Sequence, residues 1–182
     1  TESADFSSLL ASWKVKIGDN IVVDPSAVGR LPGMNEFMPA VMQYPPHAIT
    51  RTLGGTVSFF PLVRSIEPAA ASHDTLEIQI IAMTGPRSWA ESAFPKTREA
   101  AEEMGDYTPE LDSNNDEPGP IPIAVAITAA PRTLTRQDMA TLTPQEIALR
   151  PEEHELKMRM VVVGNSTFAD NTNIYMARNC HR

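Results

Sequence analysis

The stretch from Lys157 to Asn171, KMRMVVVGNSTFADN, decides the fold that we predict for this chain. It contains Met160-Val161-Val162-Val163, a short apolar and β-branched run that ends at Gly164. A run of this length before a glycine turn predicts a strand buried on both faces. The polar residues from Asn165 to Asn171 favour a turn followed by a helix start. This is the layout of an open α/β sheet, in which ligands bind at the carboxyl ends of the strands.

The composition predicts a globular domain with a core of its own. The chain has 182 residues, of which 42% are hydrophobic and 21% are charged. Its formal net charge of -8 argues against nucleic acid as a partner, because phosphate binding needs clustered Lys and Arg. No apolar run approaches the roughly 20 residues that span a bilayer. Cys180 is the single cysteine, so an intrachain disulfide is excluded.

The two ends of the chain predict a segment of a longer protein. The sequence begins at Thr1 without an initiator Met, and it ends at Arg182 where no element is complete. We expect residues 1–182 to form a single α/β domain fragment. Residues 132–155 read as an excursion between two strands, with a short helix starting at Thr143.

Periodicity predicts a mixture of strands and helices along the chain. Apolar residues at helical spacing predict a helix over 4–14, and alternation predicts a half-exposed strand over 75–83. The other expected strands are 21–23, 56–63 and 122–128, the other expected helices are 47–53 and 96–104, and 85–91 is expected to be a turn. Strands and helices that mix in this way favour an α/β fold.

Five polar residues near expected strand ends are the candidate ligand-binding residues. Asp24 follows a strand and reads either as a carboxylate ligand or as ordinary Asp-Pro turn chemistry. His47 reads as a brace for its loop. Asn165 and Ser166 could offer an anion-binding turn, but this stretch lacks the further glycines of a dinucleotide fingerprint and the lysine of a P-loop. A tight turn in which Ser166 or Asp170 caps the next helix is the simpler interpretation.

The sequence contains no complete catalytic set, and we predict no catalytic residue, metal or cofactor. The four histidines are scattered without metal-ligand spacing. Ser166 lacks the small flanking residues of a nucleophile elbow. The acidic stretch from Asp112 to Glu117 does not match the spacing of an EF-hand calcium loop.

Several short motifs, in their order and spacing, resemble one family over nearly the whole chain except the excursion. They are Leu9-Leu10-Ala11-Ser12-Trp13 with Val15, Gly18-Asp19 and Val22-Val23-Asp24-Pro25; His47 with Ile49-Thr50; Phe60-Pro61-Leu62 with Arg64-Ser65-Ile66; Ser88-Trp89-Ala90-Glu91; Pro118-Gly119-Pro120 with Pro122-Ile123-Ala124-Val125; and Val162-Val163-Gly164-Asn165-Ser166 with Phe168-Ala169 and Asn171. Together they resemble the soluble domain of gliding-motility-type ABC transporter auxiliary proteins, the GldG-like group.

The resemblance implies a Rossmann-like open mixed sheet flanked by helices, of the glutamine-amidotransferase-like class, of which this chain holds only a part. It implies an accessory subunit anchored in the cytoplasmic membrane, with this domain on the extracytoplasmic side. An ABC permease and its ATPase would be the partners. Family members usually carry Gly-Asp-Ser where this chain has Gly164-Asn165-Ser166, which argues against a charge-dependent role for the turn but keeps its capping role.

Three functions follow as hypotheses. The first is a non-catalytic interaction domain of an ABC-type transport accessory protein. The second is a Rossmann-like hydrolase or transferase, which requires Asp24, His47 or Ser166 to converge at the strand-end edge. The third is an extracytoplasmic solute-binding module, which requires a pocket of roughly 300 Å³ or more lined by the loops around Trp89 and Tyr44.

Overall fold

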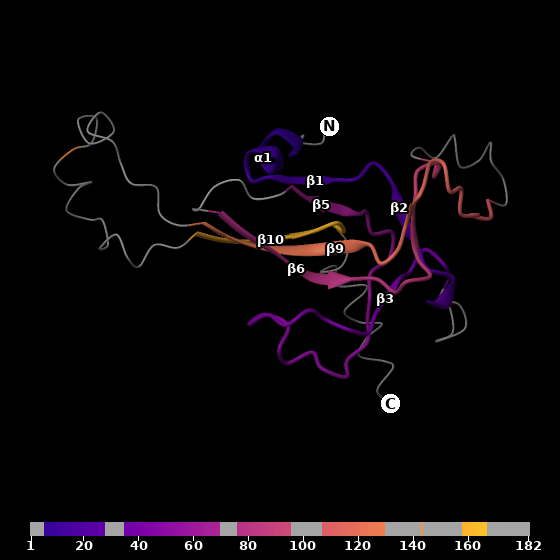
Figure 1. Ribbon diagram of the computed structural model, residues 1–182, viewed down its shortest axis with the longest axis horizontal. Helices are drawn as coiled ribbons and strands as arrows, with labels where there is room; N and C mark the ends of the chain where they lie inside the picture. The colour runs from indigo at the N-terminus through magenta and orange to yellow at the C-terminus, as the bar shows by residue number, and fades with distance from the viewer. Residues whose placement is uncertain are drawn as a thin grey trace.

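The computed structural model describes residues 6–27, 35–69, 76–95, 107–129, 143 and 158–166. Within these ranges the chain forms ten strands, one α-helix, α1 (Ser7–Ser12), and one turn of 3-10 helix, η1 (Pro25–Ala27). Every pair of neighbouring strands is antiparallel. The strands form several small sheets, and α1 lies beside β1 (Val15–Ile17) in Figure 1.

The predicted α/β fold is therefore wrong, because this is not a helix-flanked Rossmann-like sheet. The helix expected over 4–14 is reduced to α1, which is too short to cover a sheet, and the one expected over 47–53 consists of turns. The expected helix over 96–104 and a helix after Ser166 lie outside the described residues. Strands joined in antiparallel fashion need only tight turns, so they require none of the crossover helices that a parallel sheet needs.

The central sheet consists of three long strands in the order β10-β9-β6. They are β6 (Leu76–Met83), β9 (Pro122–Ala129) and β10 (Met158–Val163). Two of them confirm the expected strands at 75–83 and 122–128. The middle strand, β9, is buried along most of its length, because a sheet neighbour lies on each side of it and a packed layer lies on each face.

The strand over 160–163 exists, but the prediction that both of its faces are buried is wrong. β10 is an edge strand, and its burial alternates: Val162 is 8% exposed whereas Val161 is 48% exposed. A single apolar run has the same sequence pattern whether or not a second layer covers it. The strand that is buried on both faces is β9.

A small layer of α1, β1 and β5 (Ile66–Pro68) packs on one face of the central sheet. β1 pairs with β5 through the register Val15↔Pro68 to Ile17↔Ile66. The core between these layers consists of Leu10, Val15, Ile66, Val125, Ile127 and Val162. Within the described ranges, no helix combines the length and the apolar character that a membrane span requires.

The opposite face of the central sheet carries the remaining strands. β2 (Ile21–Val23), β7 (Trp89–Glu91) and β8 (Glu117–Pro118) form a sheet in the order β2-β7-β8, and β3 (Ala40–Val41) pairs with β4 (Ser58–Phe59). Residues 85–91 were expected to be a turn, but three of them form β7, all buried. The core here includes Val22, Val41, Val63, Ile81, Ile121 and Ile123.

Residues 63–65 join the sheets to one another. The Arg64 N–H donates to the Gly164 carbonyl (2.8 Å), and the Gly164 N–H donates to the Ile123 carbonyl (3.0 Å). On the other side, the Val22 N–H donates to the Val63 carbonyl (2.8 Å). The end of β10 thus lies inside the molecule, against a segment about a hundred residues away in sequence.

Candidate functional site

The candidate site residues Asn165 and Ser166 follow a point where the backbones of Gly164 and Arg64 cross in close contact. A Cβ added to Gly164 would lie 2.0 Å from the Arg64 carbonyl oxygen and 2.9 Å from its carbonyl carbon. Only glycine allows two backbones to approach so closely. The glycine that ends the apolar run 160–163 is therefore required by this close approach.

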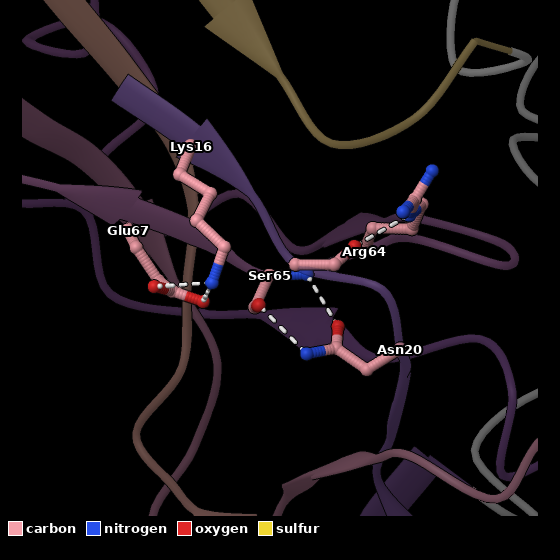
Figure 2. Close-up of polar contacts among 6 residues, drawn as sticks. Lys16, Asn20, Arg64, Ser65 and Glu67 are labelled. Carbon is pink, nitrogen blue, oxygen red and sulfur yellow. Dashed lines mark hydrogen bonds and ion pairs between the residues drawn. The ribbon is translucent and has the colours of Figure 1, made fainter. Parts of the chain in front are cut away.

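A polar network next to the crossing connects the loop before β2 with the segment before β5 (Figure 2). Asn20 Nδ2 donates to Ser65 Oγ (2.9 Å), and the Ser65 N–H donates to Asn20 Oδ1 (3.0 Å). Arg64 Nε donates to the Gly18 carbonyl (2.6 Å), and Arg64 also pairs with Asp19 (3.3 Å). Ser65 is 1% exposed, so its two bonds with Asn20 satisfy groups that water does not reach, whereas the Arg64–Asp19 pair is exposed.

Asp24 lies at the end of β2 and is 1% exposed. Its Oδ1 accepts hydrogen bonds from the N–H (2.9 Å) and the hydroxyl of Ser26, so it caps the first turn of η1. Its Oδ2 is buried, and the part of the chain that the structure describes contains no donor within hydrogen-bond distance of it. The turn chemistry expected of Asp-Pro is thus present.

His47 lies in the segment of residues 42–57 that connects β3 with β4, which we call the arm. Its Nδ1 accepts the Ile49 N–H (3.1 Å), and its carbonyl accepts the N–H groups of Thr50 (3.1 Å) and Arg51 (3.0 Å). Thr50, which is 5% exposed, donates its hydroxyl to the Pro45 carbonyl (2.9 Å). The role of His47 as a loop brace matches these contacts.

The residues after β10 have different environments. Asn165 is 7% exposed and donates through Nδ2 to the Pro61 carbonyl, so it holds the turn against the segment that follows β4. Ser166 is exposed. Asp170 lies outside the described residues.

Two turns, at residues 36–37 and 61–62, lie along the hydrogen-bonded path from Asp24 to Asn165. The Asp24 N–H donates to the Glu36 carbonyl (2.8 Å), and the Leu62 N–H donates to the Phe37 carbonyl (2.8 Å), next to the Pro61 carbonyl that Asn165 contacts. These hydrogen bonds link the two residues indirectly. Among the described residues, no hydrogen bond joins any two of Asp24, His47 and Ser166.

The structure contains a buried acidic cluster at β7 that the sequence analysis did not predict. Glu91 is 3% exposed and accepts hydrogen bonds from Trp89 Nε1 (3.2 Å) and the Ala93 N–H (3.0 Å). Asp116 is 8% exposed and accepts the N–H groups of Ser92 (3.0 Å) and Asp112 (2.8 Å). Ser88-Trp89-Ala90-Glu91 does not alternate between apolar and polar residues, so these residues carry no periodic signal for a buried strand.

Tyr107 covers this cluster together with two phenylalanines. Its ring stacks on Phe37 (centroids 6.4 Å apart) and meets the edge of Phe94 (6.2 Å). The pKa of Tyr107 is raised from 10.0 to about 12, first by burial and then by the nearby charge of Glu91, a hydrogen bond to Glu91 and the charge of Asp116. Asp112, by contrast, has a lowered pKa because the Asn114 N–H and the Asn115 amide donate to its carboxylate.

The raised pKa of Tyr107 makes stability depend on alkaline pH. Between 10.0 and about 12 the folded protein keeps the phenol proton, whereas the unfolded chain loses it. The free energy of unfolding therefore falls as pH rises through this interval. We expect Tyr107→Phe to reduce that fall, measured as the urea midpoint at about pH 9 and at about pH 12. Equal falls in the wild type and the variant would contradict this prediction.

Two grooves lie on the surface of the described residues. One has a volume of about 950 Å³ and lies beside α1, with Phe6, Leu10, Lys14, Val15 and Arg64 among its lining residues. The other has a volume of about 580 Å³ and lies in the arm, lined by residues that include Tyr44, His47, Thr50 and Arg51. The pocket expected around Trp89 and Tyr44 thus forms at Tyr44 alone, because Trp89 is buried in β7.

Comparisons with protein families, with curated proteins and with solved structures find no match to this chain. The function is therefore proposed from the site geometry and the sequence motifs.

Proposed function

We propose that this chain is a non-catalytic interaction domain of a membrane-anchored accessory protein of an ABC-type transporter. It docks through the arm onto the extracytoplasmic part of the permease, whose ATPase completes the complex. The observation that carries the proposal is the arm itself, a projecting segment with exposed apolar side chains on an ordered base (Figure 1).

The exposed apolar residues of the arm are Met42 (46% exposed), Ile49 (51%) and Val57 (44%). Large apolar side chains that project into solvent in this way are typical of protein–protein contact sites. All three lie within the 16 residues of the arm. The arm thus presents a surface to which a protein partner can dock.

The arm has enough internal structure to act as a docking element. Its base is the β3–β4 pair, with the register Ala40↔Phe59 and Val41↔Ser58. Within it, Thr50 is fixed by the Pro45 and His47 carbonyls, and the Thr56 N–H donates to the Leu53 carbonyl (2.9 Å). Such order lowers the entropy that binding costs, which favours affinity.

The family resemblance supports the transport assignment and supplies the partners. Its motifs include His47 with Ile49-Thr50, which lie in the arm, and Phe60-Pro61-Leu62, which follow it. The resemblance also implies the membrane anchor of the parent protein and the extracytoplasmic location of this domain.

The test uses the tagged full-length parent, solubilised in mild detergent, with recovery of the permease and ATPase measured by mass spectrometry. We expect Ile49→Asp and Val57→Asp to reduce their recovery about tenfold or more, because truncating a central interface contact costs about 2 kcal/mol or more. Leu111→Asp is the matched control: Leu111 is 47% exposed but lies outside the arm, so recovery should not change.

The outcomes separate the parts of this proposal. Recovery that survives both arm variants would contradict docking through the arm. Absence of any ABC ATPase or permease from the wild-type sample would contradict the transport assignment. An equal loss of recovery in Leu111→Asp would mean that added surface charge, and not the loss of a contact in the arm, lowers recovery.

The arm groove favours a second candidate function, a solute-binding module. Its volume of about 580 Å³ falls within the range of small-molecule pockets. Its lining combines an aromatic ring, Tyr44, with the basic side chain of Arg51. A solute that raises the melting temperature of the wild type but not of Arg51→Gln would support this function.

A further inference from the structure

We propose that the groove beside α1 binds an anionic amphiphile, that is, an acyl chain with a carboxylate or phosphate head, and that Lys14 receives the head. This site lies beside α1, at the top of Figure 1, whereas the arm lies below the central sheet. The proposal is independent of docking through the arm.

The floor of the groove suits an acyl chain. Its volume is about 950 Å³, near the upper end of the range for ligand pockets. Apolar side chains supply much of the lining: Phe6, Leu10, Ala11, Val15, Ile17 and Pro68. Phe6 is 62% exposed, so its ring is available to cover a bound chain.

The rim of the groove suits an anionic head. Three cations, Lys14, Lys16 and Arg64, and one carboxylate, Glu67, line the groove, in a chain whose net charge is -8. Lys16 pairs with Glu67 (3.1 Å), as Figure 2 shows, and Arg64 pairs with Asp19 (3.3 Å). For Lys14, the described part of the chain provides no carboxylate within ion-pair distance. An anionic ligand would supply that missing charge.

The backbone holds Lys14 at the rim in an unfavourable conformation. Its φ is 58°, which lies in the left-handed region. Residues other than Gly, Asn and Asp rarely adopt this region. The Lys14 N–H donates to the Ala11 carbonyl (3.0 Å), and its carbonyl accepts the Ala69 N–H (2.9 Å). A glycine would end α1 here with less strain. Strain at a ligand-facing residue is typical of functional sites, and here it places a cation beside an apolar groove.

The apolar lining and the cation Lys14 together select the ligand class. A small inorganic anion would leave the apolar floor unused, and an uncharged apolar molecule would leave Lys14 unpaired. An amphiphile with one anionic head uses both. Dodecanoate and dodecyl phosphate are suitable probes, dodecyl maltoside carries the same chain on an uncharged head, and acetate carries the carboxylate without the chain.

The test is isothermal titration calorimetry of the full chain with each probe below its micelle concentration. We expect dodecanoate or dodecyl phosphate to bind about tenfold tighter than dodecyl maltoside, because a hydrogen-bonded charge contact adds to the apolar burial. Acetate should show no binding. Co-sedimentation with phosphatidylglycerol vesicles then distinguishes the natural source: pelleting supports a bilayer lipid, and dodecanoate binding without pelleting supports a free fatty acid.

Two pairs of variants locate the site. Lys14→Asn keeps a residue that tolerates positive φ but removes the charge, and it should weaken binding of the anionic probes about fivefold while leaving dodecyl maltoside unchanged. Its control is Arg159→Gln, an exposed cation on β10 that does not line the groove. Phe6→Ala should weaken every dodecyl probe, whereas Leu9→Ala, on the same helix but not in the lining, should not.

Several results would overturn the proposal. They are equal affinity for anionic and uncharged dodecyl probes, no binding of any anionic probe, or equal losses in Lys14→Asn and Arg159→Gln. The arm variant Ile49→Asp should leave dodecanoate affinity unchanged, so failure of this proposal is distinguishable from failure of arm docking.

Discussion

Gly164→Ala is expected to lower the free energy of unfolding by about 3 kcal/mol or more. The added Cβ would lie 2.0 Å from the Arg64 carbonyl oxygen, so the two backbones must separate. Separation weakens the bonds from the Arg64 N–H to Gly164 (2.8 Å) and from the Gly164 N–H to Ile123 (3.0 Å). The first bond joins the end of β10 to the segment before β5, and the second joins it to β9. Urea unfolding followed by circular dichroism measures the loss.

The matched control is Gly54→Ala. A Cβ at Gly54 would meet nothing within 4 Å, so the same chemical change should alter the free energy of unfolding by less than about 1 kcal/mol. Similar losses in the two variants would show that the Gly164 crossing does not carry the stability assigned to it. A Gly164 variant that does not accumulate as folded protein, beside a normal Gly54 variant, agrees with the prediction.

Ile123→Ala is expected to cost about 2 to 5 kcal/mol. Ile123 is 0% exposed and lies in β9, in the core cluster that joins the central sheet to the β2 and β3 layers. Truncation removes buried methyl groups and leaves a cavity that the strands on each side prevent from closing. The change in urea midpoint at constant m-value measures the effect.

Val161→Ala on β10 is the control for this substitution. Val161 is 48% exposed, so its truncation should change the free energy of unfolding by no more than about 0.5 kcal/mol. A loss at Val161 as large as that at Ile123 would mean that β10 is buried on both faces after all. The pair therefore tests which strand is the true centre of the sheet.

Local patterns were enough to locate the long strands. The alternation in 75–83 and the apolar run in 122–128 predicted β6 and β9, because strand periodicity depends only on residues that are adjacent in sequence. The same holds for Asp24, whose capping of the next turn depends on Ser26, only two residues away. His47 and its contact with Ile49 are also local.

Pairing between distant segments was not readable from the sequence. Parallel strands need crossover connections, which are usually helices, whereas antiparallel strands do not. The short helical patterns at 47–53 and near α1 therefore led to an α/β assignment, which the structure contradicts. The burial of β10 could not be predicted, because one apolar run fits either an edge or a central strand. The buried pair of Glu91 and Asp116 depends on contacts across 24 residues of chain, such as that of Ser92 with Asp116.

By itself, the sequence determined where the long strands form, how Asp24 caps the turn after β2 and that the chain has a substantial core, since these follow from propensity and periodicity over a few residues. Only the tertiary structure decided which strands pair, that Gly164 lies against Arg64 and that Lys14 borders an apolar groove. The reason is physical: local preferences act through each residue's own φ, ψ and polarity, whereas packing and hydrogen bonds between segments some 45 or 100 residues apart depend on the whole fold.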